Sequence, residues 1–368
     1  MAKLTGLSRQ TTTQVVLELE RDGWLRVSGR MQGPLGRSAP TYEVNPQSAF
    51  VLGIRLEGSV LEMALADIRG TVVGELSEPT DPRGGLEVVH QVARLFLALT
   101  RQSGVKRDRV RLGVMGSPGV VDPKSGHIDI APSIPHLGDI NVVEALRTEL
   151  DLPLSIENGV KLAALGELWQ GAALGKRDFA YFGIGSGVGM GIVADGRLLR
   201  GASGSAGEIA YLPIGGDAFD PAGFFSGTFE AAVSGVAVVR RYEGYGGAAG
   251  ASVSTVFAAL AADDLKAAAA VDETARLVAL AIAAVRSVVD PELIVLGGTI
   301  GRRPEMGDRV RLLLPRVLPK PLEIRSGTLG DRATLVGALG QALDLLHADL
   351  FGVEAVRREI SITNVSAS

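Results

Sequence analysis

A carboxylate and an amide follow directly on a short apolar segment near the middle of the chain. Glu157 and Asn158 come after the extended apolar residues 152–156, and from Val160 onward apolar residues recur at helical spacing. In α/β proteins, ligands bind beyond the carboxyl ends of strands, and these two side chains can bond to adjacent hydroxyl groups. The next residue, Gly159, offers no side chain. The strand end at Glu157 and Asn158 therefore predicts a polar ligand site, and the sequence at this point leaves open which residue would act as its base.

Two glycine-rich segments are suited to phosphate. One covers residues 183–189, and the other is Gly297-Gly298, directly after an apolar run typical of a strand. Backbone N–H groups in such turns approach a phosphate without hindrance from side chains. Plain turns use the same residues, so each pattern alone leaves both interpretations open. The predicted phosphate-contacting residues are Gly183, Gly185, Ser186, Gly187, Gly297 and Gly298.

The elements that would position these residues occur twice. Residues 49–76 and 179–201 each predict a strand, a glycine turn, a second strand, an Ala-Asp turn and a third strand. Further helices are predicted at 86–100, 142–150 and 272–289, and further strands at 110–115 and 293–296. Two copies of such a meander predict a duplicated α/β fold with a cleft between two lobes. A last helix, 333–348, is expected to pack back on the first lobe.

The first 46 residues differ in charge from the rest of the chain. They carry six Lys or Arg residues against four Asp or Glu residues, while the whole chain has a formal net charge of −4. A small basic module on an acidic body is compatible with DNA binding by one end only.

The residue pattern of this N-terminal segment predicts a DNA-binding helix followed by a hairpin. Ser8 is a good N-cap, and Thr12, Val15, Val16 and Leu19 are predicted to form the buried face of the helix. Short polar and basic side chains at the start of such a helix suit base edges and phosphates. An ordinary amphipathic helix with a hairpin is the alternative.

A glycine-rich basic loop is predicted between the two strands of the hairpin, and it would bring arginines to phosphate. The predicted DNA-contacting residues are Ser8, Arg9, Gln10, Thr11, Thr13 and Gln14 on the helix, with Arg30 and Arg37 in the loop.

Composition excludes several classes of protein. The 368 residues are 46% hydrophobic, which is enough for two domains and a small third. There is no cysteine, which excludes disulfides, a thiolate nucleophile and cysteine-ligated zinc. The four histidines are scattered, so no metal site is predicted; they are His90, His127, His136 and His347. No apolar run has the length of a membrane span, so a cytoplasmic protein without a membrane partner is expected.

Several motifs, in order along the chain, resemble the ROK family of repressors, open reading frames and kinases. They are MGSPGVVDPKSG, IENGVKLAALGE, FGIGSGVGMGIVADGRLLRGASGSAGEIAYLPI, GTFEAAVSG, IVLGGTI and ATLVGALGQAL. The resemblance implies the actin-like ATPase (ribonuclease H-like) two-lobe fold, and the segment before it resembles the winged helix of bacterial regulators. The implied organisation is a winged helix at 1–46, lobes at 47–172 and 173–332, and a returning helix at 333–350. The first helix of the winged helix is missing, so we expect either a start upstream of Met1 or a decayed module.

The resemblance also implies that catalysis has been lost. Family kinases carry one aspartate where this chain has Arg55, and a catalytic aspartate where it has Gly159. The first change removes a carboxylate and its contact to the metal of Mg-ATP, and losing a general base costs about 10²–10⁴ in rate. The family's zinc ligands correspond to Tyr211, Pro221, Gly223 and Thr228. Neither zinc nor ATP is therefore expected as a cofactor.

Residues that bind sugar hydroxyls in the family are partly kept. By the resemblance, the predicted sugar-binding residues are Ser133, Glu157, Asn158, Glu208, Tyr211 and Glu230. Carboxylates and amides suit adjacent hydroxyls, Tyr211 is able to stack on a sugar ring, and Ser133 is able to bond through water. The alternative is that the acids only line the cleft or cap helices.

The resulting prediction is a transcriptional regulator of carbohydrate metabolism without kinase activity. A sugar or sugar phosphate in the cleft would shift the lobes, and this shift would change the spacing of the two DNA-binding domains of a dimer on operator DNA. Two-fold operators favour a homodimer or homotetramer. Two alternatives stay open: an ATP-dependent sugar kinase, and a ligand-binding pseudo-kinase that does not bind DNA.

Overall fold

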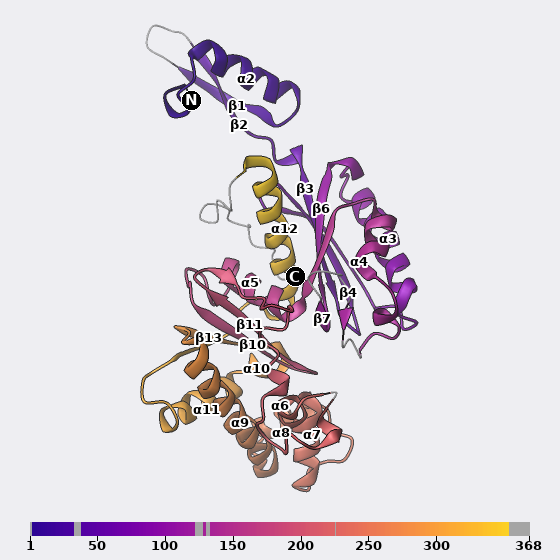
Figure 1. Cartoon of the computed structure of the whole chain (residues 1–368), viewed down its shortest axis with the longest axis vertical. Coiled ribbons are helices and arrows are strands. Elements are labelled where there is room, and N and C mark those ends of the chain that lie inside the picture. Colours follow the sequence, from indigo (N-terminus) through magenta and orange to yellow (C-terminus); the bar gives the residue numbers. More distant parts are fainter. Residues whose placement is uncertain (1, 33–37, 122–127, 130–132, 225, 353–368) are drawn as a thin grey trace.

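Two five-stranded sheets dominate the body of the protein (Figure 1). The computed structural model describes residues 2–32, 38–121, 128–129, 133–224 and 226–352. In Figure 1 the N-terminal helix and hairpin project from the top, and the two sheets lie below them.

The first sheet belongs to the part of the body that we call lobe 1, and its strand order is β5-β4-β3-β6-β9. Its strands are β3 (Phe50–Leu56), β4 (Leu61–Asp67), β5 (Val72–Glu78), β6 (Val110–Ser117) and β9 (Leu154–Asn158). The first three form an antiparallel meander, and β6 and β9 join β3 in parallel. Helices α3 (Gly85–Gln102) and α4 (Val142–Leu150) pack on this sheet, and a ribbon of β7 (Val120–Val121) and β8 (Ile128–Asp129) adjoins it.

The second sheet belongs to lobe 2, and its strand order is β12-β11-β10-β13-β14. Its strands are β10 (Phe179–Ile184), β11 (Val188–Ala194), β12 (Arg197–Leu198), β13 (Leu293–Gly297) and β14 (Glu323–Ser326). Its helices are α6 (Thr228–Val233), α7 (Gly235–Gly244), α8 (Val253–Ala261), α9 (Leu265–Val289), α10 (Gly298–Gly301) and α11 (Pro304–Leu313).

The two sheets have the same topology. In each, a three-stranded antiparallel meander is extended from its first strand by two parallel strands. The predicted duplicated α/β fold with two lobes is therefore confirmed. The long helix of lobe 2 begins earlier than predicted, at Leu265, because Asp264 caps it by accepting the N–H groups of Lys266 and Ala267 at 2.7 and 3.1 Å.

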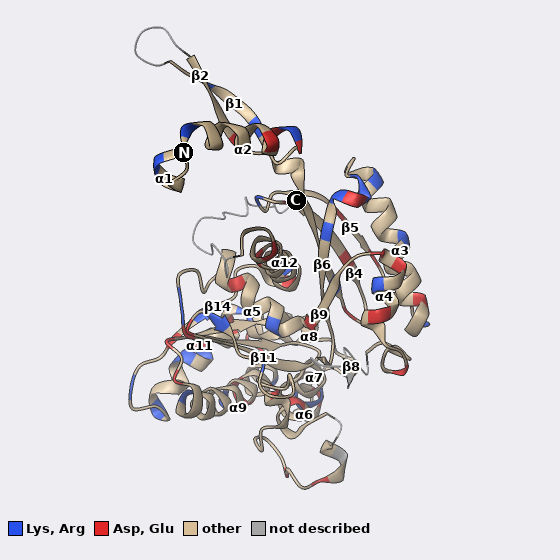
Figure 2. Ribbon diagram, turned by 45° about the horizontal axis from the view of Figure 1, so that its top comes forward, with Lys and Arg blue, Asp and Glu red and all other residues tan. Residues whose placement is uncertain are grey.

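Two helices occupy the space between the sheets (Figures 1 and 2). Helix α12 (Ala333–Phe351) packs on β3, β4 and β6 of lobe 1, and α5 (Gly159–Gln170) packs on β10 and β11 of lobe 2. Their backbones touch, because a Cβ atom at Gly337 would lie 1.9 Å from the Leu162 carbonyl oxygen. These two helices therefore join the lobes as one close-packed pair.

A buried carboxylate fixes the end of α5. Glu167 is 1% exposed, and it accepts the N–H groups of Ala172 at 2.7 Å and Leu329 at 3.0 Å. It also accepts the backbone N–H of Thr328 at 3.2 Å. Glu167 thus ties α5 to the segment that leads into α12, which is a structural role.

The N-terminal segment consists of α1 (Ala2–Thr5), α2 (Arg9–Arg21), β1 (Leu25–Gln32) and β2 (Ser38–Val44). Ser8 caps α2 by accepting the N–H of Thr11 at 3.1 Å, which confirms the predicted N-cap. Arg30 lies within β1, opposite Pro40, rather than in the loop as predicted, because β1 continues to Gln32. Arg37 lies outside the described residues.

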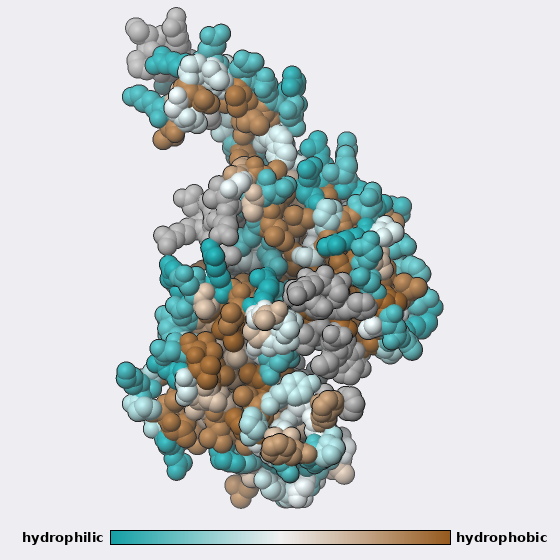
Figure 3. All heavy atoms as spheres, in the orientation of Figure 1, coloured by the Kyte–Doolittle hydropathy of each residue, from teal (hydrophilic) through white to brown (hydrophobic). Residues whose placement is uncertain are grey.

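The predicted buried face of α2 is wrong for the described chain. Val15 and Leu19 are 39% and 37% exposed, and Thr12 and Val16 are only half-buried. No described residue before Ser48 is buried, since no described element covers this side of the helix. Figure 3 accordingly shows hydrophobic atoms on the surface of the N-terminal segment.

None of the helices in the described part of the chain has the length and apolar character needed to cross a membrane.

Candidate ligand site between the lobes

The predicted carboxylate and amide lie at the carboxyl end of β9, where the chain enters α5. Asn158 is the N-cap of α5, and its side-chain oxygen accepts the N–H groups of Val160 and Lys161 at 2.9 and 3.3 Å. Its amide nitrogen donates to the carbonyl oxygen of Gly119 at 2.8 Å. The amide therefore shapes the start of α5, and its role in sugar binding stays a prediction.

Glu157 is paired across the lobes. One carboxylate oxygen accepts the Nε–H of Arg200 at 2.7 Å, and the other accepts the N–H of Asn158 at 3.1 Å. The residue is 8% exposed. Arg200 belongs to the loop that follows β12 in lobe 2. This ion pair therefore joins the end of β9 to lobe 2, at the place that we call the junction between the lobes.

Lys161 is the second buried charge of the junction. It is 2% exposed, and its ammonium donates to the carbonyl oxygen of Gly204 in the same lobe 2 loop. Burial lowers the pKa of Lys161, while the carboxylates of Glu157 and Glu208 act in the opposite direction.

Two half-buried carboxyls belong to lobe 2, and one of them, Glu208, interacts with both Lys161 and the other, Glu230. Burial raises the pKa of Glu208; Lys161 opposes that effect and Glu230 adds to it. Burial also raises the pKa of Glu230, although the carboxylate accepts the N–H of Val188 at 2.8 Å. Carboxyls in such surroundings can accept hydrogen bonds from the hydroxyls of a polyol.

The two glycine-rich segments lie side by side. Gly183 and Gly297 are register partners at the ends of the parallel strands β10 and β13. Gly298 has φ +74°, and a Cβ there would lie 2.4 Å from the Ile184 carbonyl oxygen, so only glycine fits without a backbone shift. At the turn between β10 and β11, the N–H of Gly185 donates to the Gly187 carbonyl oxygen at 2.9 Å. Ser186 and Gly187 are exposed at this turn.

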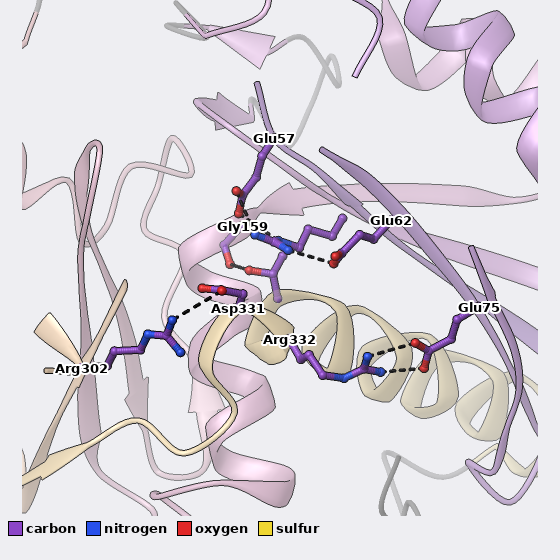
Figure 4. A network of polar contacts seen from close by, with 9 residues as sticks. Glu57, Glu62, Glu75, Gly159, Arg302, Asp331 and Arg332 are labelled. Atoms are coloured by element: carbon purple, nitrogen blue, oxygen red, sulfur yellow. Dashed lines mark hydrogen bonds and ion pairs between the residues drawn. The ribbon is translucent and has the colours of Figure 1, made fainter. Parts of the chain in front are cut away.

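Arg55 sits at the end of β3 in a cluster with two glutamates (Figure 4). Its guanidinium bonds to Glu57 at 2.9 Å and to Glu62 at 2.8 Å, and the residue is 8% exposed. Burial alone would lower the pKa of Arg55, but the two carboxylates together raise it. The position that the resemblance assigns to a metal-facing aspartate is therefore filled by a neutralised cation.

Gly159 begins α5, and its surroundings do not require a glycine at this position. Its carbonyl oxygen accepts the hydroxyl of Thr334, the second residue of α12, at 3.0 Å (Figure 4). A Cβ at Gly159 would meet its nearest neighbours, in Ser117 and Thr334, at 3.6 Å, which is ordinary contact. The structure thus accepts a Cβ at this position, and the sequence does not supply one.

The positions of the family's zinc ligands lie in lobe 2 between residues 211 and 228. Tyr211 is 44% exposed and ends a short 3-10 helix (Ile209–Tyr211), and Thr228 begins α6. Pro221 and Gly223 belong to another 3-10 helix, and a Cβ at Gly223 would lie 3.9 Å from the Thr228 hydroxyl. No group of three or more His, Cys, Asp or Glu residues suited to a metal occurs among the described residues.

Ser133 follows β8 in the chain and lies against Gly58, in the turn between β3 and β4. It is exposed, and its carbonyl oxygen would lie 2.7 Å from a Cβ at Gly58. No hydrogen bond links Ser133 to Glu157 or Glu208 in the described part of the chain, and its sugar contact stays a prediction.

A surface groove runs along α2 in the N-terminal segment. It is lined by Arg9, Gln10, Thr13, Gln14, Leu17, Glu18 and Arg21, and so includes four of the predicted DNA-contacting residues. Ser8 and Thr11 bond to each other at the start of the same helix. Figure 2 shows both basic and acidic residues along this helix.

Sequence reasoning missed two residues of the junction, Lys161 and Arg200. The sequence contained one signal for the first, since Lys161 stands within the apolar run Val160 to Leu165. Arg200 had no signal, because its partner Glu157 lies far away in the sequence and the pairing depends on how the lobes meet.

The comparisons with known proteins match chiefly the two-lobe body of the chain. The profile described as ROK family matches residues 51–344. A glucokinase of Halalkalibacterium halodurans is 30% identical over 313 residues, which are 78% of this chain and 93% of the enzyme. A xylose repressor of Caldicellulosiruptor bescii is 28% identical over 218 residues, which are 58% of this chain and 54% of the repressor.

Solved structures give the same two kinds of relative. A ROK hexokinase from Thermus thermophilus matches with a TM-score of 0.70 and 28% identity, over 82% of this chain and 99% of the other. A ROK-family transcriptional regulator described as a homologue of the E. coli MLC protein matches with a TM-score of 0.73 and 22% identity. That match covers 93% of this chain and 90% of the regulator. The chain is therefore similar both to sugar kinases and to repressors.

Proposed function

The chain belongs to the ROK family, and from this premise we propose that it is a transcriptional regulator that binds operator DNA and senses a sugar without phosphorylating it. The effector is a sugar or sugar derivative held between the lobes, and the regulated genes belong to carbohydrate metabolism. A regulator of this kind acts in the cytoplasm and contacts no membrane.

One observation carries the proposal: the start of α5 has no carboxylate at the position of the base. Gly159 lacks a side chain although a Cβ there would make only ordinary contacts. The adjacent Glu157 is committed to Arg200 and to a backbone N–H. A sugar hydroxyl at this position therefore meets no free base, and general-base catalysis is worth about 10²–10⁴ in rate.

The cluster around Arg55 supports the same conclusion. A metal ion that bridges nucleotide phosphates is held by carboxylates, and here a buried guanidinium bonds to both nearby carboxylates, Glu57 and Glu62. We therefore expect no productive Mg-ATP binding, and the glycine turns at Gly185 and Gly297 are vestigial. Neither zinc nor ATP is proposed as a cofactor.

The N-terminal segment supports the DNA-binding half of the proposal. We interpret α2 as a recognition helix and the β1–β2 hairpin as a wing, since Arg9, Gln10, Thr13 and Gln14 share one groove. The solved regulator matches 93% of this chain, so that fold match extends into the first 46 residues. The proposed assembly is a homodimer or homotetramer, which suits a two-fold operator.

The proposed sugar site is centred on Glu208 and Glu230 in lobe 2, with Glu157 and Asn158 in lobe 1 and Tyr211 and Ser133 at the periphery. An effector that binds better to one arrangement of the lobes shifts the equilibrium toward it. The two arrangements would space the DNA-binding heads differently.

Selection from a pool of random-sequence DNA duplexes tests the regulator directly. We expect the 368-residue chain to enrich one sequence and to lose affinity for it steeply with salt. Arg9→Ala should weaken binding to that duplex, whereas Arg101→Ala, at an exposed position on α3 in lobe 1, serves as the control and should not. Failure to enrich any sequence at low salt would reject the regulator.

A sugar kinase is the second candidate, favoured by 30% identity to a glucokinase over 93% of that enzyme. A coupled ADP-release assay across hexoses and amino sugars distinguishes it, because the proposed regulator gives no sugar-dependent turnover. Turnover that a substitution at Gly185 abolishes would establish the kinase. A third candidate is a ligand-binding pseudo-kinase without DNA binding, favoured by the uncovered face of α2. It predicts thermal stabilisation by a sugar and no enriched duplex.

A further inference from the structure

We propose that α12 is a lever that couples the junction between the lobes to the N-terminal helix and hairpin. Its sensing end is Thr334, and its output end is His347 together with the cluster that holds Trp24. The inference deepens the proposed function, on which its regulatory meaning rests, by assigning the route from the effector site to the DNA-binding segment.

The sensing end of α12 is bonded to both lobes and to α5 (Figure 4). Just before the helix, Arg332 makes two bonds to Glu75 of lobe 1, at 2.6 and 3.0 Å. The neighbouring Asp331 contacts Arg302 of lobe 2 at 3.5 Å. Thr334 then bonds to the Gly159 carbonyl oxygen. A change in the spacing of the lobes, or a ligand that moves the start of α5, must therefore act on this end of α12.

The middle of α12 has little freedom to absorb such a movement. Gly337 lets α12 touch the backbone of α5, and a Cβ at Gly340 would lie 2.0 Å from the ring of Trp169. On its other side, Leu339 fills the space over Gly53 of β3, where a Cβ would lie 2.8 Å away. Close-packed interiors shift between discrete arrangements rather than deform continuously.

The output end reaches the N-terminal segment through lobe 1. The buried ring of His347, 6% exposed, donates from Nε2 to the carbonyl oxygen of Ile68 at 3.1 Å. The next residue, Arg69, donates to the Glu43 carboxylate at 2.8 Å and to the Val44 carbonyl oxygen at 3.0 Å. Both acceptors lie at the end of β2, so α12 is linked to the hairpin through one continuous set of bonds.

Trp24 forms a second link at the same end. It precedes β1 and packs, half-buried, against the cluster that includes Leu343 and Leu346 of α12. Figure 1 shows the corresponding end of α12 directed at the base of the N-terminal segment. A helix of this length, 19 residues, carries a displacement over about 28 Å at 1.5 Å per residue.

The chain supplies its own reporter for the lever. It contains two tryptophans, Trp24 and Trp169, so Trp169→Phe leaves the output end as the sole source of tryptophan fluorescence. In this background, Thr334→Val removes the hydroxyl bond to Gly159 at the other end of α12. We expect the acrylamide quenching constant of Trp24 to change roughly twofold or more.

Two control variants make the result specific. Thr334→Ser keeps the hydroxyl and should keep the parent quenching constant. Thr148→Val removes a matched bond, from a threonine hydroxyl to the Glu144 carbonyl oxygen at 2.9 Å, but within α4, and should also leave Trp24 unchanged. An unchanged quenching constant in folded Thr334→Val would overturn the lever, as would an equal change in either control.

Hydrogen exchange tests the same coupling along α12 with both tryptophans in place. Amides of β1 and β2 should exchange at a different rate in Thr334→Val than in the parent chain, and equal rates would overturn the proposal. Neither experiment contains DNA or sugar. A failure of the lever is therefore distinguishable from a failure of the proposed function, which the duplex selection tests alone.

Discussion

Replacing Arg55 by methionine should destabilise lobe 1 by about 2–3 kcal/mol. The guanidinium makes three contacts of 2.8–2.9 Å with Glu57 and Glu62. Hydrogen bonds to charged groups contribute about 1.5–3 kcal/mol each, but the Glu57 and Glu62 side chains are 47% and 26% exposed. Solvent screening therefore reduces the total to about the value of one such bond. Arg55→Met also leaves two carboxylates without their shared counter-ion.

Urea denaturation and thermal unfolding near neutral pH measure this effect. At about 2–4 °C per kcal/mol for a domain of this size, the melting temperature should fall by roughly 4–12 °C. Arg94→Met is the control, because Arg94 also makes two bonds to a carboxylate, that of Glu78, but on an exposed surface with side chains 60% and 36% exposed. Arg94→Met should lower the free energy of unfolding by less than about 1 kcal/mol. Equal losses in the two variants would refute the claim that the Arg55 cluster is a buried feature.

Arg55→Asp extends the test to the function of the site. Three carboxylates would then gather at the end of β3, and such an oxygen-rich group binds Mg²⁺. We expect this variant to be less stable than Arg55→Met and to be stabilised by millimolar MgCl₂, whereas the parent chain should not respond. A magnesium response of the parent chain would contradict the proposal that Arg55 occupies the carboxylates that would otherwise hold the metal.

Three further predictions concern groups at the junction. Burial raises the pKa of Glu208 and Glu230 above the usual 4.5 in the folded chain, so their stabilising contribution is complete below that pH and is lost as the pH rises through the folded pKa. Glu208→Gln and Glu230→Gln should therefore raise the melting temperature near neutral pH and lose this advantage toward pH ~4.5; a pH-independent difference would be evidence against the buried carboxyls. Gly159→Ala should leave the free energy of unfolding unchanged or raise it by up to about 1 kcal/mol. In Gly337→Ala the new Cβ would lie 1.9 Å from a carbonyl oxygen, so urea titrations should show a loss of about 2 kcal/mol or more. A reversed order of the two variants would contradict the packing of α5 on α12. Glu167→Gln should cost about 2–4 kcal/mol, because an amide group would face N–H donors, and a loss below 1 kcal/mol in the same titrations would show that the carboxylate is not needed there.

The repeated meander could be predicted from the sequence because its signals are local. Alternating apolar residues and glycine turns at Gly58 and Gly185 mark the strands, and the two sheets have the topology that this repetition implies. The N-cap at Ser8 is equally local, since the accepting oxygen and the donating N–H are three residues apart.

The pairings inside the junction could not be predicted, because they join residues far apart in the chain. Glu157 meets Arg200 only where the loop after β12 folds over β9, and Thr334 meets Gly159 only because α12 returns between the lobes. The periodicity of α2 marks an apolar face, but periodicity does not say what covers that face, so the prediction that it is buried is wrong and Leu19 is exposed in the described chain.

The central claim is that a sugar between the lobes alters the affinity for DNA. The most direct measurement is the dissociation constant for the selected duplex, by fluorescence anisotropy at fixed salt, with and without each sugar that raises the melting temperature. We expect at least one such sugar to change the constant by about 5-fold or more, the range of typical coupling free energies, and Glu208→Ala to abolish the change. Identical dissociation constants with and without every stabilising sugar would contradict the account.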